Sequence, residues 1–201
     1  MNPHTEIVDL SPGDFVSARW EIAEVYRRAF AEQQYPHPER EVVRFRNVLS
    51  HHAERSGFRC KVARDERGVL GVAYGYTGTG GQWWHDVVAA ALPSEEAEQW
   101  LGDCFELVEL HLMPEAQGLG VGGQLHDELL ASLPHSTAAL STLDAETRAL
   151  HLYKKRGWVP LLTNFEFPGG AKPFLIMGLE LRPGIPPPDP GATRPAALSG
   201  E

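Results

Sequence analysis

Four glycines within six positions, in the segment PEAQGLGVGG, constrain the fold of this chain more than any other feature of its sequence. Glycine lets a backbone approach a ligand closely, and successive amides in such a bend point into one concavity. An apolar run from Phe105 to Met113 precedes the segment, and an amphipathic stripe follows it at Val121, Leu125, Leu129 and Leu133. Together these features predict a strand, an anion-binding bend and a helix whose N-terminus favours a bound phosphate.

The glycine segment is similar in its spacing to two known nucleotide-binding motifs. Gly118, Gly120 and Gly123 spell G-x-G-x-x-G, and Asp144 stands about 20 residues further on, where a dinucleotide-binding fold places its ribose-binding carboxylate. Against that interpretation, residues 114–117 separate the strand from the glycines, over half of the ordered chain precedes them, and Asp144 can instead cap a helix. A P-loop is excluded because no Gly-Lys-Ser/Thr follows. An NAD(P)-binding oxidoreductase therefore remains only a distant alternative.

Length and composition are those of a single globular domain. The chain has 201 residues, of which 42% are hydrophobic and 22% charged, and we expect one domain over residues 1–182. Proline and small residues dominate afterwards, so residues 183–201 are expected to form a disordered tail. We recognise neither a basic leader nor a long apolar stretch, which favours a cytoplasmic protein without membrane contact.

The net charge and the spacing of potential metal-binding side chains limit the classes of ligand and partner that we expect. The formal net charge of −9 argues against nucleic-acid binding and fits a cationic partner better. Cys60 and Cys104 are too far apart for a metal or redox motif, and we expect two reduced thiols in or near the core. The histidines lack H-E-x-x-H spacing, so no metal is expected. Four of them are expected at the surface: His51, His52, His126 and His135.

Hydrophobic periodicity predicts an alternation of strands and helices along the chain. Strands are expected over residues 5–10, in a hairpin at 58–76, and over 105–113, 137–143, 159–167 and 173–181. Helices are expected from Ser11, from Pro38, after the glycines as far as Leu133, and from a cap at Asp144 to Gly157. Residues 77–101 are interpreted as an insertion that carries one or two short helices.

Two segments resemble sequence motifs of the GNAT superfamily of N-acetyltransferases. QGLGVG, Gln117 to Gly122, matches its Q/R-x-x-G-x-G/A motif, and ALHLYKKRGW, Ala149 to Trp158, matches A-x-x-x-Y-x-x-x-G-F with tryptophan in place of phenylalanine. Glu146 stands where the family often has asparagine. The resemblance implies an α/β fold, in which helices cover both faces of a central, mostly antiparallel sheet that is splayed at the cofactor. It also implies acetyl-CoA as the acyl donor and an amine as the acceptor.

The same resemblance assigns residues to the cofactor. The pyrophosphate is expected at backbone amides of the glycine segment, and the pantetheine arm beside the preceding strand. The residues concerned are Leu110, His111, Leu112, Gln117, Gly118, Leu119, Gly120, Val121, Gly122, Gly123 and Tyr153. By analogy with the family, the N–H of Leu110 donates to the developing oxyanion, and Tyr153 is the acid for the departing thiolate. A phenol, with a pKa of about 10, is protonated at neutral pH and can donate.

The base that takes the amine proton has several candidates. Glu106, eleven residues before Gln117, is preferred because some family members carry a catalytic carboxylate there. Glu109 and His111 lie on the opposite face of the strand if side chains alternate strictly, but a β-bulge would exchange the faces. An ordered water is a further alternative.

The acceptor is expected in loops around this strand. Trp83 and Trp84, in the insertion, can stack on a cationic or apolar group, or can pack the insertion onto the core. Tyr35, between the first two helices, is a second candidate. A small amine, an amino acid, a polyamine or a protein N-terminus all fit, in a monomer or a homodimer. A CoA-binding regulatory module without turnover is the alternative function.

Overall fold

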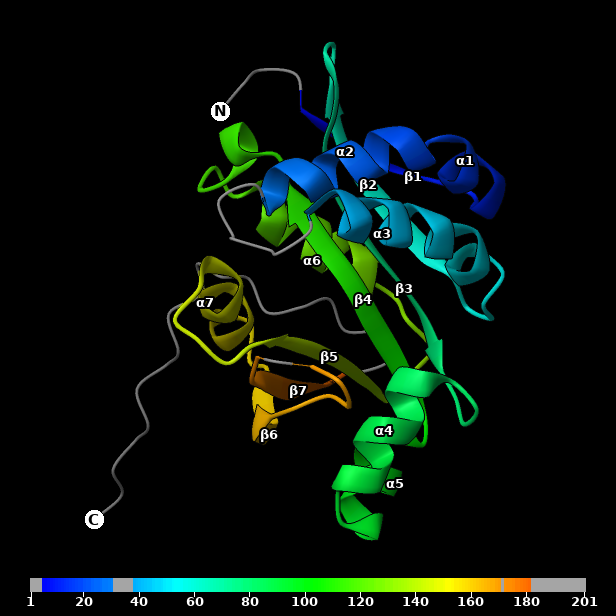
Figure 1. Cartoon of the computed structure of the whole chain (residues 1–201), viewed down its shortest axis with the longest axis vertical. Coiled ribbons are helices and arrows are strands. Elements are labelled where there is room, and N and C mark those ends of the chain that lie inside the picture. Colours follow the sequence, from blue (N-terminus) through cyan, green and yellow to red (C-terminus); the bar gives the residue numbers. More distant parts are fainter. Residues whose placement is uncertain (1–4, 31–37, 171, 182–201) are drawn as a thin grey trace, which may run out of the picture.

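The strands form one mixed sheet in the order β1-β2-β3-β4-β5-β7-β6 in the computed structural model, which describes residues 5–30, 38–170 and 172–181 (Figure 1). Their bounds are β1 Glu6–Asp9, β2 Arg59–Asp65, β3 Gly68–Gly78, β4 Cys104–Leu112, β5 Thr137–Leu143, β6 Val159–Phe165 and β7 Phe174–Glu180. Neighbouring strands are antiparallel except β4 and β5, which are parallel. Every strand that the sequence predicts is therefore present.

β4 and β5 pair over only part of their length. The pairing runs from Cys104 opposite Thr137 to Glu106 opposite Ala139. Beyond that point both strands continue and diverge, so that the sheet opens into a fork between them (Figure 1). The expected α/β fold with a splayed, mostly antiparallel sheet is confirmed.

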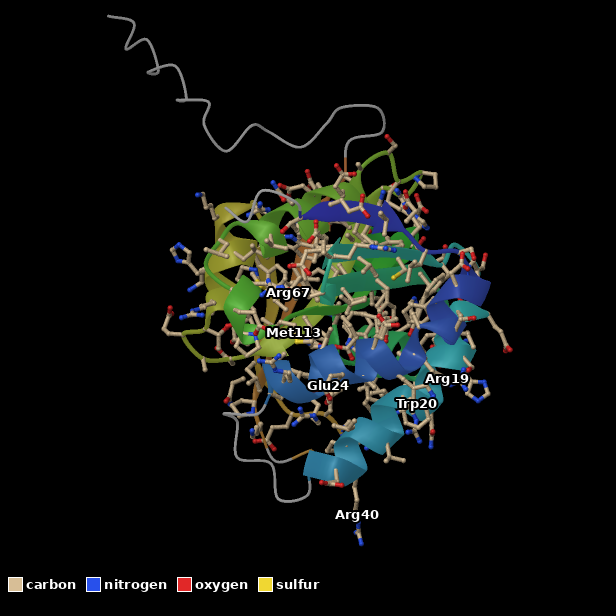
Figure 2. All side chains as sticks on the ribbon, turned by 90° about the horizontal axis from the view of Figure 1, so that it is seen from above. Arg19, Trp20, Glu24, Arg40, Arg67 and Met113 are labelled. Carbon is tan, nitrogen blue, oxygen red and sulfur yellow. The ribbon has the colours of Figure 1, made fainter. Side chains whose placement is uncertain are left out.

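Helices cover both faces of the sheet. Three pack on one face of the β1–β4 half: α1 (Pro12–Ser17), α2 (Arg19–Ala29) and α3 (Pro38–Ala53). On the same side, α4 (Trp83–Ala91) and α5 (Ser94–Leu101) of the insertion cover β5 and β7. The opposite side carries α6 (Val121–Leu130) and α7 (Arg148–Lys155), and a short 3₁₀ helix, η1 (Pro114–Ala116), joins β4 to α6. Seen from above, side chains fill the space between α2, α3 and the sheet, while Arg40 points away from it (Figure 2).

The limits of two helices differ from the sequence prediction. Thr147, and not Asp144, is the N-cap of α7, and its hydroxyl accepts a backbone N–H from the first turn. The Asp144 carboxylate, just after β5, instead accepts the N–H of Asn164 in β6, at 2.7 Å. α6 ends at Leu130, and Leu133 reaches the same core from the turn that follows. The first difference involves a contact between distant residues, Asp144 and Asn164, whereas α6 ends just before Ser132, whose φ of 56° does not fit a right-handed helix.

Burial of the histidines also departs from expectation. His126 and His135 are only 3% and 6% exposed, so the surface prediction is wrong for both. Each is buried with a hydrogen-bond partner, Trp158 for His126 and Thr77 for His135. Both cysteines are buried and free, as expected. Within the described ranges, no group of acidic, histidine and cysteine side chains could hold a metal ion, and no helix has the length and apolarity to cross a bilayer.

Candidate active site

A β-bulge in β4 decides which side chains meet at the fork. Tyr76 lies opposite Glu106 and Tyr74 opposite Glu109, so one residue of β4, Val108, has no partner in β3. Residues that pair directly share a face of the sheet, and Tyr74 and Tyr76 share one by alternation. Glu106 and Glu109 therefore lie on the same face, toward the helices α1 to α5.

Gly75 gives the bulge its room. A Cβ atom at this position would lie 2.2 Å from the carbonyl oxygen of Glu106 and 2.6 Å from the ring of Phe105. Only glycine allows the two backbones to approach this closely. His111, opposite Val72, lies on the same face as Glu106 and Glu109, because the bulge has shifted the alternation beyond Val108. The exchange of faces that strict alternation forbids thus takes place.

The surroundings of Glu106 suit a general base. It is the last β4 residue paired with β5, its side chain is 5% exposed, and its Oε2 has no hydrogen-bond partner among the described residues. Burial raises the pKa of its carboxyl to about 8, against a lowering by Arg55 and with a further increase from Glu109. Near neutral pH such a carboxyl can both release and accept a proton.

Glu109 and His111, the other candidates for the base, engage each other. The ring of His111 is hydrogen-bonded through Nε2 to the carboxylate of Glu109. Tyr26 and Phe30 surround that ring edge-on, with centroids 5.2 and 5.0 Å away. The pair is therefore already satisfied, in contrast to Glu106.

Four polar residues near this face had not been predicted as site residues, and one of them, His52, had been expected at the surface. Tyr74 is fully buried, and its hydroxyl is 3.0 Å from Nδ1 of His52, at the end of α3. The ring of Tyr76 lies next to Glu106, with the guanidinium of Arg55 6.0 Å from its centroid. The alternation of tyrosines in an otherwise apolar strand was the one signal that could have revealed them.

The glycine segment divides into two functional pairs. Gly118 and Gly120 have φ of 75° and 86°, and no atom lies within 4 Å of a Cβ built on either. Gly122 and Gly123 instead allow close packing, since a Cβ would lie 2.9 Å from the Leu112 side chain and 2.3 Å from the Arg156 guanidinium respectively. The first pair leaves an open backbone surface at the start of α6, of the kind that holds a pyrophosphate.

The other expected cofactor residues frame this surface. Gln117 donates through Nε2 to the carbonyl of Leu112 at 3.2 Å and accepts from Arg148 at 2.9 Å, which ties the loop to β4 and α7. Leu119 projects outward and is 53% exposed, and Val121 is buried. Leu110 and Leu112 lie on the part of β4 that has no partner in β5. Along the fork the backbone of β4 is thus unpaired with β5, and the carbonyl of Leu112 is taken up by Gln117.

Tyr153 of α7 lies on the other side of the fork. Its side chain is 5% exposed and packs against Trp158 and His126, with ring centroids 5.7 and 6.3 Å away. Burial raises the pKa of its hydroxyl, and the charge of Glu109 raises it further. The phenol is therefore protonated throughout the neutral range.

The two tryptophans of the insertion have different surroundings. Trp84 donates from Nε1 to the hydroxyl of Ser141 at 3.2 Å, just beyond the last paired residue of β5. Trp83 is 60% exposed, and its ring centroid is 5.4 Å from that of Phe167. Trp84 thus packs the insertion onto the fork, whereas Trp83 stays at the surface. Tyr35 lies outside the described residues.

Comparison with known proteins adds the family. Residues 19–158 match the sequence profile of the acetyltransferase (GNAT) family. A GCN5-like protein acetyltransferase of Mycobacterium tuberculosis is 37% identical over 121 residues, which are 56% of this chain and 59% of that protein. The chain thus spans less than two thirds of the length of this curated relative.

Solved structures share the fold. The PaiA N-acetyltransferase of Thermoplasma acidophilum, solved in complex with coenzyme A, has a TM-score of 0.59 at 15% identity, covering 88% of this chain and 99% of that one. A Salmonella typhimurium protein assigned as an acetyltransferase, solved with acetyl-CoA, has a TM-score of 0.56 at 13% identity, with coverages of 91% and 98%. The family profile extends over most of the chain and includes the glycine segment and Tyr153. The chain therefore belongs to the acetyltransferase (GNAT) family.

Proposed function

We propose that this chain transfers an acetyl group from acetyl-CoA to a primary amine by direct attack of the amine. The observation that carries the proposal is the buried Glu106 carboxyl at the point where β4 and β5 part, one oxygen of which has no hydrogen-bond partner in the described part of the chain. Further along β4, the strand edge is open as far as the glycine loop. A proton acceptor and an anion-binding loop thus lie at the two ends of one fork.

The chain offers matching groups for the acyl donor. Backbone amides of the glycine segment after Gln117, as far as Gly123, would hold the pyrophosphate in the open space at Gly118 and Gly120, whereas the N–H of Gln117 itself donates to the Pro114 carbonyl at 3.2 Å. The unpaired edge of β4 from Leu110 to Leu112 would hold the pantetheine arm by backbone hydrogen bonds. When bound, acetyl-CoA supplies an activated acetyl thioester.

Three groups of this chain serve the chemical step. The Glu106 carboxylate accepts the proton that the acceptor ammonium must lose before its nitrogen can attack. The N–H of Leu110 donates a hydrogen bond to the thioester carbonyl oxygen as negative charge develops on it. The hydroxyl of Tyr153 would protonate the sulfur as the carbon–sulfur bond breaks, and the phenolate would take up the second proton that the nitrogen loses as the amide forms, so that the free thiol of CoA and the acetylated amine are the products.

The acceptor is proposed to approach from the face that carries Glu106, Tyr76 and Trp84. The carboxyls of Glu106 and Glu109 and the net charge of −9 favour a cationic amine. The Mycobacterium tuberculosis relative is named as a protein acetyltransferase, which supports lysine side chains or peptide N-termini as acceptors beside small amines. A CoA-binding module without turnover remains the second candidate function.

Ligand-induced stabilisation tests the cofactor first. Acetyl-CoA and CoA at about 100 times their dissociation constant should each stabilise the fold by about 2.7 kcal/mol, seen as a higher melting temperature, whereas NAD and NADP should give no shift. Release of free thiol from acetyl-CoA is then followed with polyamines, amino acids and lysine peptides. Binding without thiol release for any acceptor supports the regulatory module, and a shift with NAD(P) alone contradicts the proposal.

A further inference from the structure

A partly buried polar network joins the helix of the glycine loop to the helix of Tyr153. Asp127 of α6 receives two hydrogen bonds from Arg156, at the end of α7: Nε to Oδ1 at 2.6 Å and Nη2 to Oδ2 at 2.9 Å. Nδ1 of His126 is 2.8 Å from the same Oδ1, and Nε1 of Trp158 donates to Nε2 of His126 at 2.9 Å. Two consecutive residues of α6 are thus bonded to two residues just after α7.

The indole N–H of Trp158 determines the tautomer of His126. Indole nitrogen can only donate, so Nε2 of the imidazole accepts and its proton lies on Nδ1, directed at Asp127. Burial lowers the pKa of His126, and the ring therefore stays neutral. Burial alone would raise the pKa of Asp127, but hydrogen bonds from His126 and Arg156 outweigh it and lower that pKa to about 2. The network is a fixed set of one carboxylate, one guanidinium and one neutral ring.

At Gly123 the side chain of Arg156 reaches the surface of α6. The Arg156 guanidinium lies where a side chain at position 123 would be, 2.3 Å from an ideal Cβ. Gly123 and Asp127 are four residues apart and so lie on one face of α6, and Arg156 crosses that face. The contact begins in the first turn of α6, directly after the open glycines Gly118 and Gly120.

We infer that the His126–Asp127–Arg156 network, with Trp158, positions the Tyr153 hydroxyl relative to the cofactor-binding loop. The ring of Tyr153 packs against the rings of Trp158 and His126, the two residues that one hydrogen bond of the network joins. The inference rests on the proposed function, in which the loop holds the pyrophosphate and Tyr153 serves the leaving sulfur of the same molecule. The network keeps the distance between these two points constant, and acts through Tyr153 without touching the substrate.

Trp158, which donates one hydrogen bond of the network, is also the residue at which the sequence departs from the family motif. Trp158 stands where the resembling motif has phenylalanine, and its N–H is the donor that His126 accepts. Trp158→Phe therefore removes one hydrogen bond while it keeps an aromatic ring. We expect kcat to fall about fivefold to tenfold, because small misplacements of a catalytic group are costly, with the Kd for acetyl-CoA changed by less than about twofold.

A double-mutant cycle with Tyr153→Phe is the decisive experiment. If the network acts by positioning the hydroxyl, Trp158→Phe should cause little further loss of kcat in an enzyme that lacks it. Thr77→Val is the matched control, because it also removes a buried histidine hydrogen bond, that of His135, but away from α6 and α7. Its effect on kcat should be the same with and without Tyr153→Phe.

Each result has a distinct meaning. Equal losses of kcat from Trp158→Phe on both backgrounds, or no loss on the wild-type background, would overturn the inference. Full activity of Tyr153→Phe would show that Tyr153 is not the acid for the leaving sulfur. A wild-type protein that transfers no acetyl group would refute the proposed function. If Trp158→Phe fails to fold, Asp127→Asn replaces it in the cycle, since it keeps an acceptor oxygen for His126 and removes the charge that holds Arg156.

Discussion

The glycine loop and the carboxylate end of β4 are two parts of one candidate site, but they are constructed in opposite ways. The loop is a contiguous segment whose backbone is open to solvent at Gly118 and Gly120. The carboxylate end assembles buried side chains from β3, β4 and the end of α3, around Glu106 and Tyr76. The loop would bind a ligand through solvent-exposed backbone, whereas the protonation of Glu106 depends on the side chains that bury it.

The comparison also separates the two kinds of polar group involved. Backbone amides carry no net charge and do not titrate, so binding at the loop should depend on shape and on the charge of nearby substituents. A buried carboxyl is governed by desolvation, so activity should depend on pH. Three substitutions, which give four predictions, test this difference, from the largest expected effect to the smallest.

Gly120→Asp should weaken acetyl-CoA binding by about a thousandfold, because a negative charge placed in an anion site costs several kcal/mol. The left-handed φ of 86° adds strain to the substitution. Isothermal titration calorimetry measures the affinity. Gly169→Asp is the control, since Gly169 has a similar φ of 77° and equal room for a side chain but lies in the turn between β6 and β7. Retained affinity in Gly120→Asp would refute the assignment of the loop.

Glu106→Gln should lower kcat/KM by about a hundredfold, since it removes the proposed base while the fold and cofactor binding are kept. In the wild-type enzyme kcat/KM should rise with pH and level off above about 8, the pKa of this carboxyl. The variant should lose this rise. A pH profile of the variant that still increases through the same range would assign the base to another group, such as Glu109 or a bound water.

The same substitution should change the pH dependence of stability. The pKa of Glu106 is raised from 4.5 to about 8 in the folded protein, so the proton is bound more tightly there than in the unfolded chain. The associated stabilisation is present below pH 4.5 and is lost as pH rises toward about 8. Glu106→Gln should therefore gain in stability relative to wild type over this range, by at most a few kcal/mol, seen as a higher melting temperature. Equal pH profiles of melting temperature would contradict the burial argument.

Arg55→Gln should give the smallest effect. Arg55 lowers the pKa of Glu106, so its removal should move the rise in kcat/KM to higher pH, by at most about one unit for an exposed charge. Activity at pH well above 8 should be unchanged. Arg67→Gln, at the exposed turn between β2 and β3, is the control and should leave the profile in place. A shift to lower pH would contradict the assigned electrostatics.

The outcome of the sequence predictions follows the same division. The order of strands and helices and the position of the glycine loop were predicted correctly, because periodicity and glycine spacing are local properties. The N-cap at Thr147 in place of Asp144 and the burial of His126 and His135 were missed. Each missed feature depends on a partner remote in the chain: Asn164, Trp158 and Thr77.

The sequence by itself determined the strand, the open bend at Gln117 to Gly123 and the helix that follows, since apolar periodicity and glycine spacing within residues 105–133 contain the conformational information that these elements need. Only the tertiary structure decided which acidic side chains share a face. A bulge at Val108, which requires the close approach permitted by Gly75 on the neighbouring strand, brings Glu109 and His111 to the side of Glu106. Strand periodicity cannot predict this, because one unpaired residue reverses every side chain beyond it.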